Sequence, residues 1–217
     1  MYDKEKIKRF YNYTLEEYNS SIIIEDIVSV KPVEKTDGSF IQIGIRPLVD
    51  DEFLIAPNFD ERLPGIGRIV ASGEAEYLIK QITENKGVEK TEFKEDIKEL
   101  PKYVNSNDII LLSTKFYVEF FTKLERRISY GGKHPLLDMG NFVIALSEKI
   151  LGDKIIILDK NAIQWEKELF NNPVTNKKEK IDISVTPRLD KADILVRSVN
   201  KIRYLDPNSI RVLEVKK

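Results

Sequence analysis

Apolar side chains recur at helical spacing near the start of the chain. Between residues 3 and 19 they fall three or four positions apart, with lysines and glutamates in between: Ile7, Phe10, Tyr11, Leu15 and Tyr18. This spacing places them on one face, so we predict an amphipathic helix that ends at Ser20 and Ser21.

A second helix is predicted from Ser72 to Asn85. Serine is a favourable N-cap, and acidic residues such as Glu74 and Glu76 suit a first turn. Apolar residues then follow at helical spacing: Ala75, Leu78, Ile79 and Ile82. The charge-dense stretch 87–107 carries Phe93, Ile97 and Leu100 at helical spacing, which predicts a short surface helix followed by a loop.

The strongest β signal lies between residues 22 and 45. Two β-branched runs, at 22–24 and 27–30, are followed by a polar turn with Asp37 and Gly38 at its tip, and then by strict alternation over 40–45. Two strand patterns around such a turn predict a β-hairpin. Its long arms and charged tip predict that it projects from the body of the protein.

Strand and helix patterns follow one another in the second half. A buried strand is predicted at 108–112, and Ser113 is expected to cap a helix that reaches residue 128. Its inner face would carry Phe116, Phe120, Phe121 and Leu124. Further strands are predicted at 154–158, 181–185, 194–204 and 210–215. The fold class is therefore α+β, with a mixed β-sheet, flanking helices and a projecting β-hairpin.

Composition and charge narrow the class of protein. The 217 residues carry 35 basic and 36 acidic side chains, so no overall positive field attracts nucleic acid. No apolar run is long enough to span a membrane, and no apolar segment follows the N-terminal charges as in a secretion signal. The absence of cysteine excludes disulfides, thiolate metal sites and cysteine nucleophiles. A single histidine, His134, excludes a polyhistidine metal centre, and we expect no cofactor and no metal.

Isoleucine, lysine and glutamate are frequent, while alanine, glutamine and methionine are scarce. This bias is typical of thermophile proteins, although an AT-rich genome produces a similar one.

Two motifs invite a functional interpretation. Residues 64–68 resemble part of a phosphate-binding loop, but the third glycine is missing and residues 68–70 have a β-like rather than a helical pattern, so we interpret the segment as a turn. Asp206, Glu214 and Lys216 match the acid, then acid-x-lysine spacing of metal-dependent nucleases. In such a site the carboxylates would hold Mg²⁺ and the lysine would support the attacking water.

Other chemistry-bearing residues have simpler interpretations. Carboxylates cluster at 50–52 and 60–61, where charge runs in loops are usually solvated. Trp165 is expected to be a core or interface anchor.

The order of elements from residue 108 onward resembles that of a known family. A buried strand and an aromatic-rich helix lead to the Gly131-Gly132 loop, and later a long β segment runs through Asp206 and Pro207 into a final apolar strand. This order resembles the C-terminal half of tailed-phage major capsid proteins and of the encapsulins.

The resemblance implies a structural, self-assembling shell subunit without a catalytic site, either capsid-like or encapsulin-like. It implies an N-terminal region, 1–107, with a helix, an extended hairpin and peripheral-type elements. An axial-type region, 108–217, would return to the C-terminal strands within one intertwined unit. The family's long spine helix would lie within 46–107, where prolines leave its position open.

The implied partner is the chain itself, in a large homo-oligomer, with a cargo protein or packaged nucleic acid inside it. No membrane is implied, and the location would be the cytoplasm, or a virion if the shell is viral. Viral and cellular shells both remain open at this point.

Candidate assembly contacts are apolar residues of the hairpin and of the proline-interrupted region: Phe40, Ile41, Ile43, Phe53 and Leu54. A projecting hairpin gains little stability alone and needs a neighbour to cover it. Two alternatives remain open, namely the Mg²⁺-dependent nuclease and a small oligomeric accessory or binding protein.

Overall fold

The computed structural model describes residues 4–37, 40–49, 65–94, 99–119, 141–187 and 191–216. The chain forms two compact units, each assembled from separate stretches. The first comprises Met1–Glu25, Val30–Ala75 and Trp165–Arg203, and the second comprises Asp26–Ser29, Glu76–Gln164 and Tyr204–Lys217. No helix in the described part of the chain has both the length and the apolar run needed to cross a membrane.

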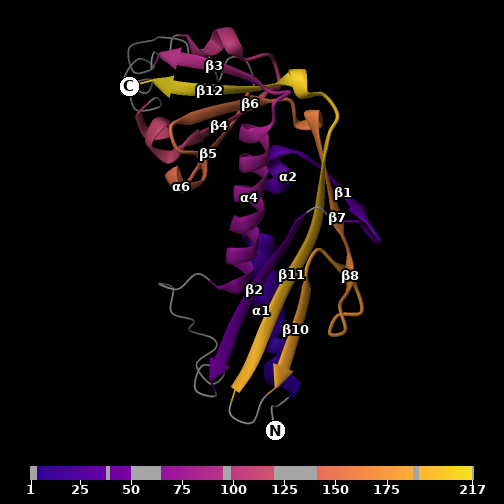
Figure 1. The fold of residues 1–217 in the computed structure, drawn as a ribbon. Helices are drawn as coiled ribbons and strands as arrows, with labels where there is room; N and C mark the ends of the chain where they lie inside the picture. Colours follow the sequence, from indigo (N-terminus) through magenta and orange to yellow (C-terminus); the bar gives the residue numbers. More distant parts are fainter. Residues whose placement is uncertain are drawn as a thin grey trace. The chain divides into compact units, whose positions relative to one another are not determined.

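The sheet of the first unit is built around one long strand, β11 (Lys191–Tyr204). Its strand order is β1 (Ser29–Val33), β7 (Ile163–Glu168), β11 and β10 (Asp182–Pro187), and β2 (Phe40–Val49) also pairs with β11. Both long pairings are antiparallel: β2 runs from Phe40 opposite Asn200 to Val49 opposite Lys191. Figure 1 shows β2, β11 and β10 side by side. A short hairpin, β8 (Phe170–Asn171) with β9 (Lys178–Glu179), follows β7.

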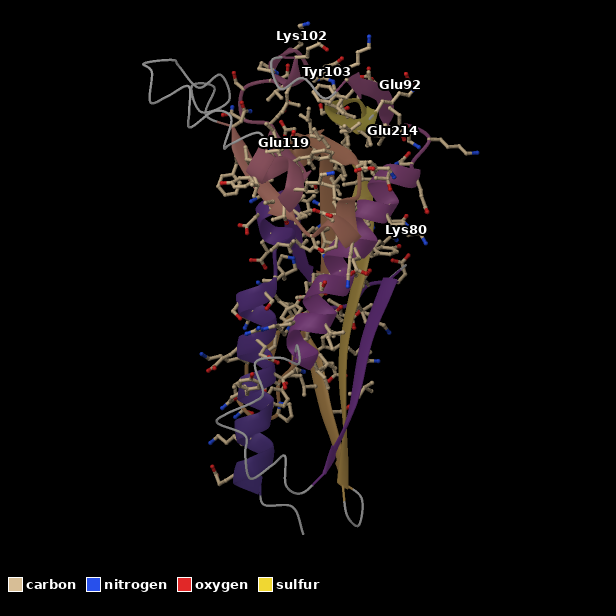
Figure 2. The ribbon with its side chains drawn as sticks, turned by 90° about the vertical axis from the view of Figure 1, so that its left-hand side faces the viewer. Lys80, Glu92, Lys102, Tyr103, Glu119 and Glu214 are labelled. Carbon is tan, nitrogen blue, oxygen red and sulfur yellow. The ribbon has the colours of Figure 1, made fainter. Side chains whose placement is uncertain are left out.

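Two helices pack in this unit, α1 (Lys4–Ser21) and the first part of α4 (Ile66–Glu84), with the short α2 (Ile24–Ile27) after α1. Apolar residues of both helices and of the strands form one core: Tyr11, Leu15, Tyr18, Ile66, Val70, Ala71, Ile181, Ile183 and Val196. The helices approach closely at Gly67, where an added Cβ would lie 2.4 Å from the Thr14 carbonyl oxygen. Glycine is therefore required for this contact. Figure 2 shows the ribbons of α1 and α4 next to each other.

The second unit holds a mixed five-stranded sheet in the order β3-β12-β6-β4-β5. The strands are β3 (Glu89–Lys94), β12 (Ile210–Lys216), β6 (Lys154–Leu158), β4 (Ile109–Ser113) and β5 (Phe142–Leu146). The outer pairs are parallel, and β6 runs antiparallel to both of its neighbours. The unit also contains short helices at Leu100–Tyr103, Glu148–Leu151 (α6), Lys160–Ala162 and Pro207–Ser209.

Most elements predicted from hydrophobic periodicity are confirmed. The first helix and the strands at 108–112, 154–158, 181–185, 194–204 and 210–215 all form, with ends shifted by a few residues. The cap predicted at Ser113 is also confirmed, because its hydroxyl accepts a hydrogen bond from the Phe116 amide at 3.3 Å. The α+β class with mixed sheets is therefore correct.

Three local predictions are wrong. The runs at 22–24 and 27–30 do not form a hairpin arm that pairs with the strand at 40–49. Residues Ile24–Ile27 form the helix α2, β1 joins β7, and the long edge of β11 takes all ten residues of β2. The second helix starts at Ile66 rather than Ser72, since Gly67 serves helix packing instead of a turn. Residues 89–94 form a strand, not a surface helix, because β12 offers them a parallel edge and Phe93 enters the core. Ile97 lies outside the described residues.

Candidate functional site

A fully buried carboxylate, Glu74 on α4, accepts hydrogen bonds from three other elements of the first unit. Its Oε1 atom forms an ion pair with the Lys167 ammonium of β7 and accepts a hydrogen bond from Asn200 Nδ2 of β11 at 3.3 Å. Its Oε2 atom accepts the hydroxyl of Tyr18, on α1, at 3.0 Å. Glu74, Tyr18 and Asn200 are 0% exposed and Lys167 is 1% exposed. The four side chains form a polar cluster closed to water.

Two further side chains fix the orientation of Asn200. Trp165 Nε1 donates to Asn200 Oδ1 at 2.9 Å, and Asn200 Nδ2 also donates to Ser198 Oγ at 3.1 Å. An indole nitrogen can only donate, so the atom facing it must be the carbonyl oxygen of the amide. The amino group of Asn200 therefore faces Glu74.

Burial controls the electrostatics of the cluster. It lowers the pKa of the Lys167 ammonium, and the Glu74 carboxylate opposes part of that shift. Burial, reinforced by the charge of Glu74 and its hydrogen bond, holds the pKa of the Tyr18 hydroxyl well above its usual value. The Lys167 ammonium also lies 4.9 Å from the centre of the Tyr18 ring, within the range of a cation–π contact.

The cluster joins α1, α4, β7 and β11 through one acceptor. A buried charge is tolerated only when it is paired and hydrogen-bonded, so these four elements must keep one arrangement for every donor to find Glu74. The cluster therefore fixes the first part of α4 against the sheet of the first unit.

The sequence analysis missed this cluster, although two signals for it were present. Val70, Glu74 and Leu78 are four residues apart, which places Glu74 on the buried face of the helix rather than in a solvated first turn. Trp165 and Lys167 alternate on β7, so a buried tryptophan implies a buried lysine on the same face. The partners themselves were not predictable, because 93 residues separate Glu74 from Lys167.

The structure does not assemble the predicted nuclease motif. Asp206 caps the turn before β12, accepting the Asn208 amide at 3.2 Å, whereas Glu214 lies four residues into that strand from Ile210. Lys216 forms an ion pair with Glu92 at 2.5 Å, and Figure 2 shows Glu92 and Glu214 on the neighbouring strands β3 and β12. Within the residues that the structure describes, no three acidic or histidine side chains are grouped as metal ligands.

The candidate assembly contacts are only partly within the described residues. Phe40, Ile41 and Ile43 lie on β2, where the backbone but not the side chains is described. Phe53 and Leu54 lie outside the described residues. The same holds for the carboxylates at 50–52 and 60–61, for the Gly131-Gly132 loop, and for His134, Phe120, Phe121 and Leu124.

The two aromatic residues predicted as core residues and described by the structure are buried. Trp165 is fully buried in the polar cluster, and Phe116 belongs to the core of the second unit.

Comparison with known proteins finds no match in sequence and many matches in structure. No protein-family model matches the chain, and no curated protein matches its sequence. A virus-like particle from Pyrococcus furiosus superimposes with a TM-score of 0.63 at 15% identity, covering 95% of this chain and 98% of that one. The SrpI encapsulin of Synechococcus elongatus gives 0.54 at 13% identity, over 88% and 86% of the two chains.

A phage capsid protein also matches the chain in structure at low sequence identity. The capsid of cyanophage P-SCSP1u matches with a TM-score of 0.55 at 8% identity, over 90% of this chain and 88% of that one. The chain has the fold of phage capsid proteins and encapsulins. The resemblance seen in the order of elements is thus confirmed at the level of the fold, and it extends beyond residues 108–217 to nearly the whole chain.

Proposed function

We propose that this protein is a structural subunit of a self-assembling shell. The observation that carries the proposal is the end-to-end match to the Pyrococcus furiosus particle chain, in which 95% of one chain corresponds to 98% of the other. Encapsulin and phage capsid chains match over similar shares.

The partner in this proposal is the chain itself. The assembly contacts would include the edge of the sheet formed by β2, which carries Phe40, Ile41 and Ile43, together with Phe53 and Leu54 in the segment that follows. Apolar side chains of this kind form the centre of obligate interfaces. A cargo protein or packaged nucleic acid would occupy the interior, in the cytoplasm or in a virion.

A structural role also agrees with the positions of the residues in the predicted nuclease motif, which do not form a metal-binding group. Asp206 and Glu214 sit at different places along one strand and its preceding turn, and each has a local role or an exposed position there. The proposal therefore assigns no catalysis to these residues.

The deciding measurement is the mass of the purified protein in solution. Light scattering behind a sizing column should give particles in the megadalton range, and negative-stain microscopy should show closed shells of uniform size. A monomer to tetramer that persists across salt and pH would overturn the proposal and favour a small oligomeric accessory protein.

We further propose a thermophilic source. The isoleucine, lysine and glutamate bias supports it, as does the Pyrococcus structure among the structural neighbours. Ion pairs also join distant segments of the chain, such as Glu34 with Lys178 at 2.5 Å and Asp37 with Lys201 at 2.6 Å. Such pairs contribute more to stability at high temperature, because the cost of removing their charges from water falls. The melting temperature of the protein should lie above the mesophile range of about 45–65 °C, and a value inside that range would favour codon bias instead.

A further inference from the structure

The second unit contains a pocket of about 270 Å³. Its walls come from the C-terminal part of α4, from α6 and from the first residue of β6, all of which belong to this unit. Three isoleucine and leucine side chains supply the apolar lining, with Ile79 and Leu151 buried and Ile150 half-buried. The polar lining consists of Glu76, Lys80, Thr83, Lys149 and Lys154.

Three lysines from three different elements share this pocket with one carboxylate. Lys80 lies on α4 (Figure 2), Lys149 on α6 and Lys154 at the start of β6. None of their ammonium groups forms an ion pair with a carboxylate of the described residues, although Glu76 lies one turn before Lys80. Three ammonium groups against one carboxylate leave two net positive charges, which repel one another. An anion bound between the lysines would relieve this repulsion.

We propose that the pocket binds a sugar phosphate, with its phosphate group held by Lys80, Lys149 and Lys154. A lysine ammonium binds phosphate as a point charge and carries three hydrogen-bond donors. The oxygens of a phosphate group can accept from several such donors at once. The three lysines therefore supply the charge and the donors that this end of the ligand needs.

Glu76 and Thr83 select the rest of the ligand. The Glu76 carboxylate only accepts hydrogen bonds, and the Thr83 hydroxyl already donates to the Lys80 carbonyl oxygen at 3.0 Å, so its oxygen is left as an acceptor. A phosphate dianion has no hydrogen to donate to these acceptors, and Glu76 repels it. Sugar hydroxyls donate to both groups, which favours a hydroxylated phosphate ester over free phosphate.

The size of the pocket limits the ligand further. Its volume of about 270 Å³ lies just below the range of about 300–1,000 Å³ that is typical of small-molecule sites. A pentose phosphate suits this volume better than a dinucleotide does, and its carbon skeleton can pack against Ile79 and Leu151. The inference does not depend on the proposed shell, because every lining residue belongs to one unit of one chain.

Isothermal titration of the full-length protein tests the proposal, with ribose 5-phosphate and inorganic phosphate as the two probes. At about 0.15 M salt, where long-range attraction is screened, ribose 5-phosphate should bind with a dissociation constant below about 1 mM. Inorganic phosphate should bind several-fold more weakly. No binding of ribose 5-phosphate, or equal binding of the two probes, would overturn the proposal.

Charge-neutral variants locate the site. Lys80→Gln, Lys149→Gln and Lys154→Gln should each weaken the binding of ribose 5-phosphate by about five- to tenfold. Lys86→Gln and Lys160→Gln are the matched controls, because both lysines are exposed in the same unit but lie outside the pocket. An equal loss of affinity in the controls would show a general effect of charge and contradict a built site.

Glu76→Ala separates recognition of the sugar from recognition of the phosphate. The substitution removes a repulsive charge and an acceptor, so it should tighten the binding of inorganic phosphate and weaken the preference for ribose 5-phosphate. A preference as large as that of the wild type would remove the hydroxyl contact from the proposal and overturn the assignment to a sugar phosphate.

Lysine acetylation of the wild-type protein gives a readout that does not require any variant to fold. Ribose 5-phosphate should slow the acetylation of Lys80, Lys149 and Lys154, measured by mass spectrometry of the peptides, and leave Lys86 and Lys160 unaffected. Unchanged rates at the three pocket lysines, or equal protection of the two control lysines, would place the ligand elsewhere and overturn the proposal.

Discussion

At the scale of single residues, the strongest constraint is the burial of Glu74 and Lys167. Removing two charges from water costs several kcal/mol per ion, which is offset only when the pair has good geometry and every remaining donor and acceptor is satisfied. Tyr18 and Asn200 supply those additional hydrogen bonds to Glu74. The intact pair is therefore tolerated in the core, whereas removal of either partner should strongly destabilise the fold.

Glu74→Gln should destabilise the protein strongly. The substitution leaves the Lys167 ammonium buried without an opposite charge, so we expect a loss of roughly 3–5 kcal/mol in the free energy of unfolding. Glu76→Gln is the matched control, because Glu76 is exposed on the same helix and its loss should cost less than about 0.5 kcal/mol. Urea denaturation of the two variants measures the difference, and equal midpoints would contradict the role given to Glu74.

Tyr11 should make stability depend on pH in alkaline solution. Burial, with smaller contributions from Asp182 and Glu179, raises the pKa of Tyr11 to about 12, from 10.0 in the unfolded chain. Between these values the folded protein keeps a proton that the unfolded chain has lost, so stability falls as pH rises through this window.

Tyr11→Phe should therefore flatten the alkaline decline between about pH 10 and 12. The decline would not vanish, because burial also raises the pKa values of Tyr18 and Tyr204. Tyr117→Phe, at an exposed position of the second unit, is the control and should leave the decline unchanged. The measurement is the urea midpoint as a function of pH, and parallel curves for wild type and Tyr11→Phe would refute the assignment.

At the scale of elements, the start of α4 shows how packing extends a helix beyond its local signals. Gly65 and Gly67 have low helix propensity, and the sequence alone favours a turn there. The helix nevertheless begins at Ile66, because Gly67 allows it to approach the backbone of α1 and bury Ile66, Val70 and Ala71. Tertiary pairing also overrides the local signal in β1 and β2. These strands do not pair with each other, because β1 pairs with β7 and β2 pairs with β11.

Gly67→Ala should weaken the contact between α1 and α4. The new methyl group would lie 2.4 Å from the Thr14 carbonyl oxygen and 2.7 Å from the Tyr18 nitrogen, and neither backbone atom can move without shifting the helix. We expect a loss of about 1–3 kcal/mol, against the gain that alanine normally gives within a helix. Ser72→Ala, at an exposed position of the same helix, should be neutral or stabilising by about 0.5 kcal/mol. Stabilisation by both substitutions, seen in the urea midpoints, would rule out the close packing of the two helices.

At the scale of the whole molecule, substitutions that unfold the subunit must be distinguished from substitutions that prevent its assembly. Residues of the polar cluster should affect the folding of the subunit, whereas the candidate assembly contacts should affect only association. The distinction matters because an unfolded subunit also fails to assemble.

Phe53→Asp combined with Leu54→Asp should prevent particle formation and leave the subunit folded. A charge placed in the apolar centre of an interface costs several kcal/mol per contact, and a closed shell repeats that cost at every subunit. Leu205→Asp is the control, because Leu205 is apolar and 58% exposed but is not one of the candidate contacts. Light scattering should show megadalton particles for the control and small species for the double variant, with unchanged circular dichroism in both. Particles of wild-type mass from the double variant would remove these residues from the interface.

Features that depend on neighbouring residues could be predicted from the sequence. Periodicity was sufficient for α1, β4, β6 and β12, because each buries one face or is buried throughout, and the cap at Ser113 followed from its position before a helix. The order of these elements was sufficient to indicate the shell-protein fold. The pairing of the strands, the start of α4 at Ile66 and the contact of Glu74 with Asn200 across 126 residues of chain depend instead on tertiary packing. Contacts of this kind depend on which surfaces remain available after the rest of the chain has packed, and a local pattern carries no information about them.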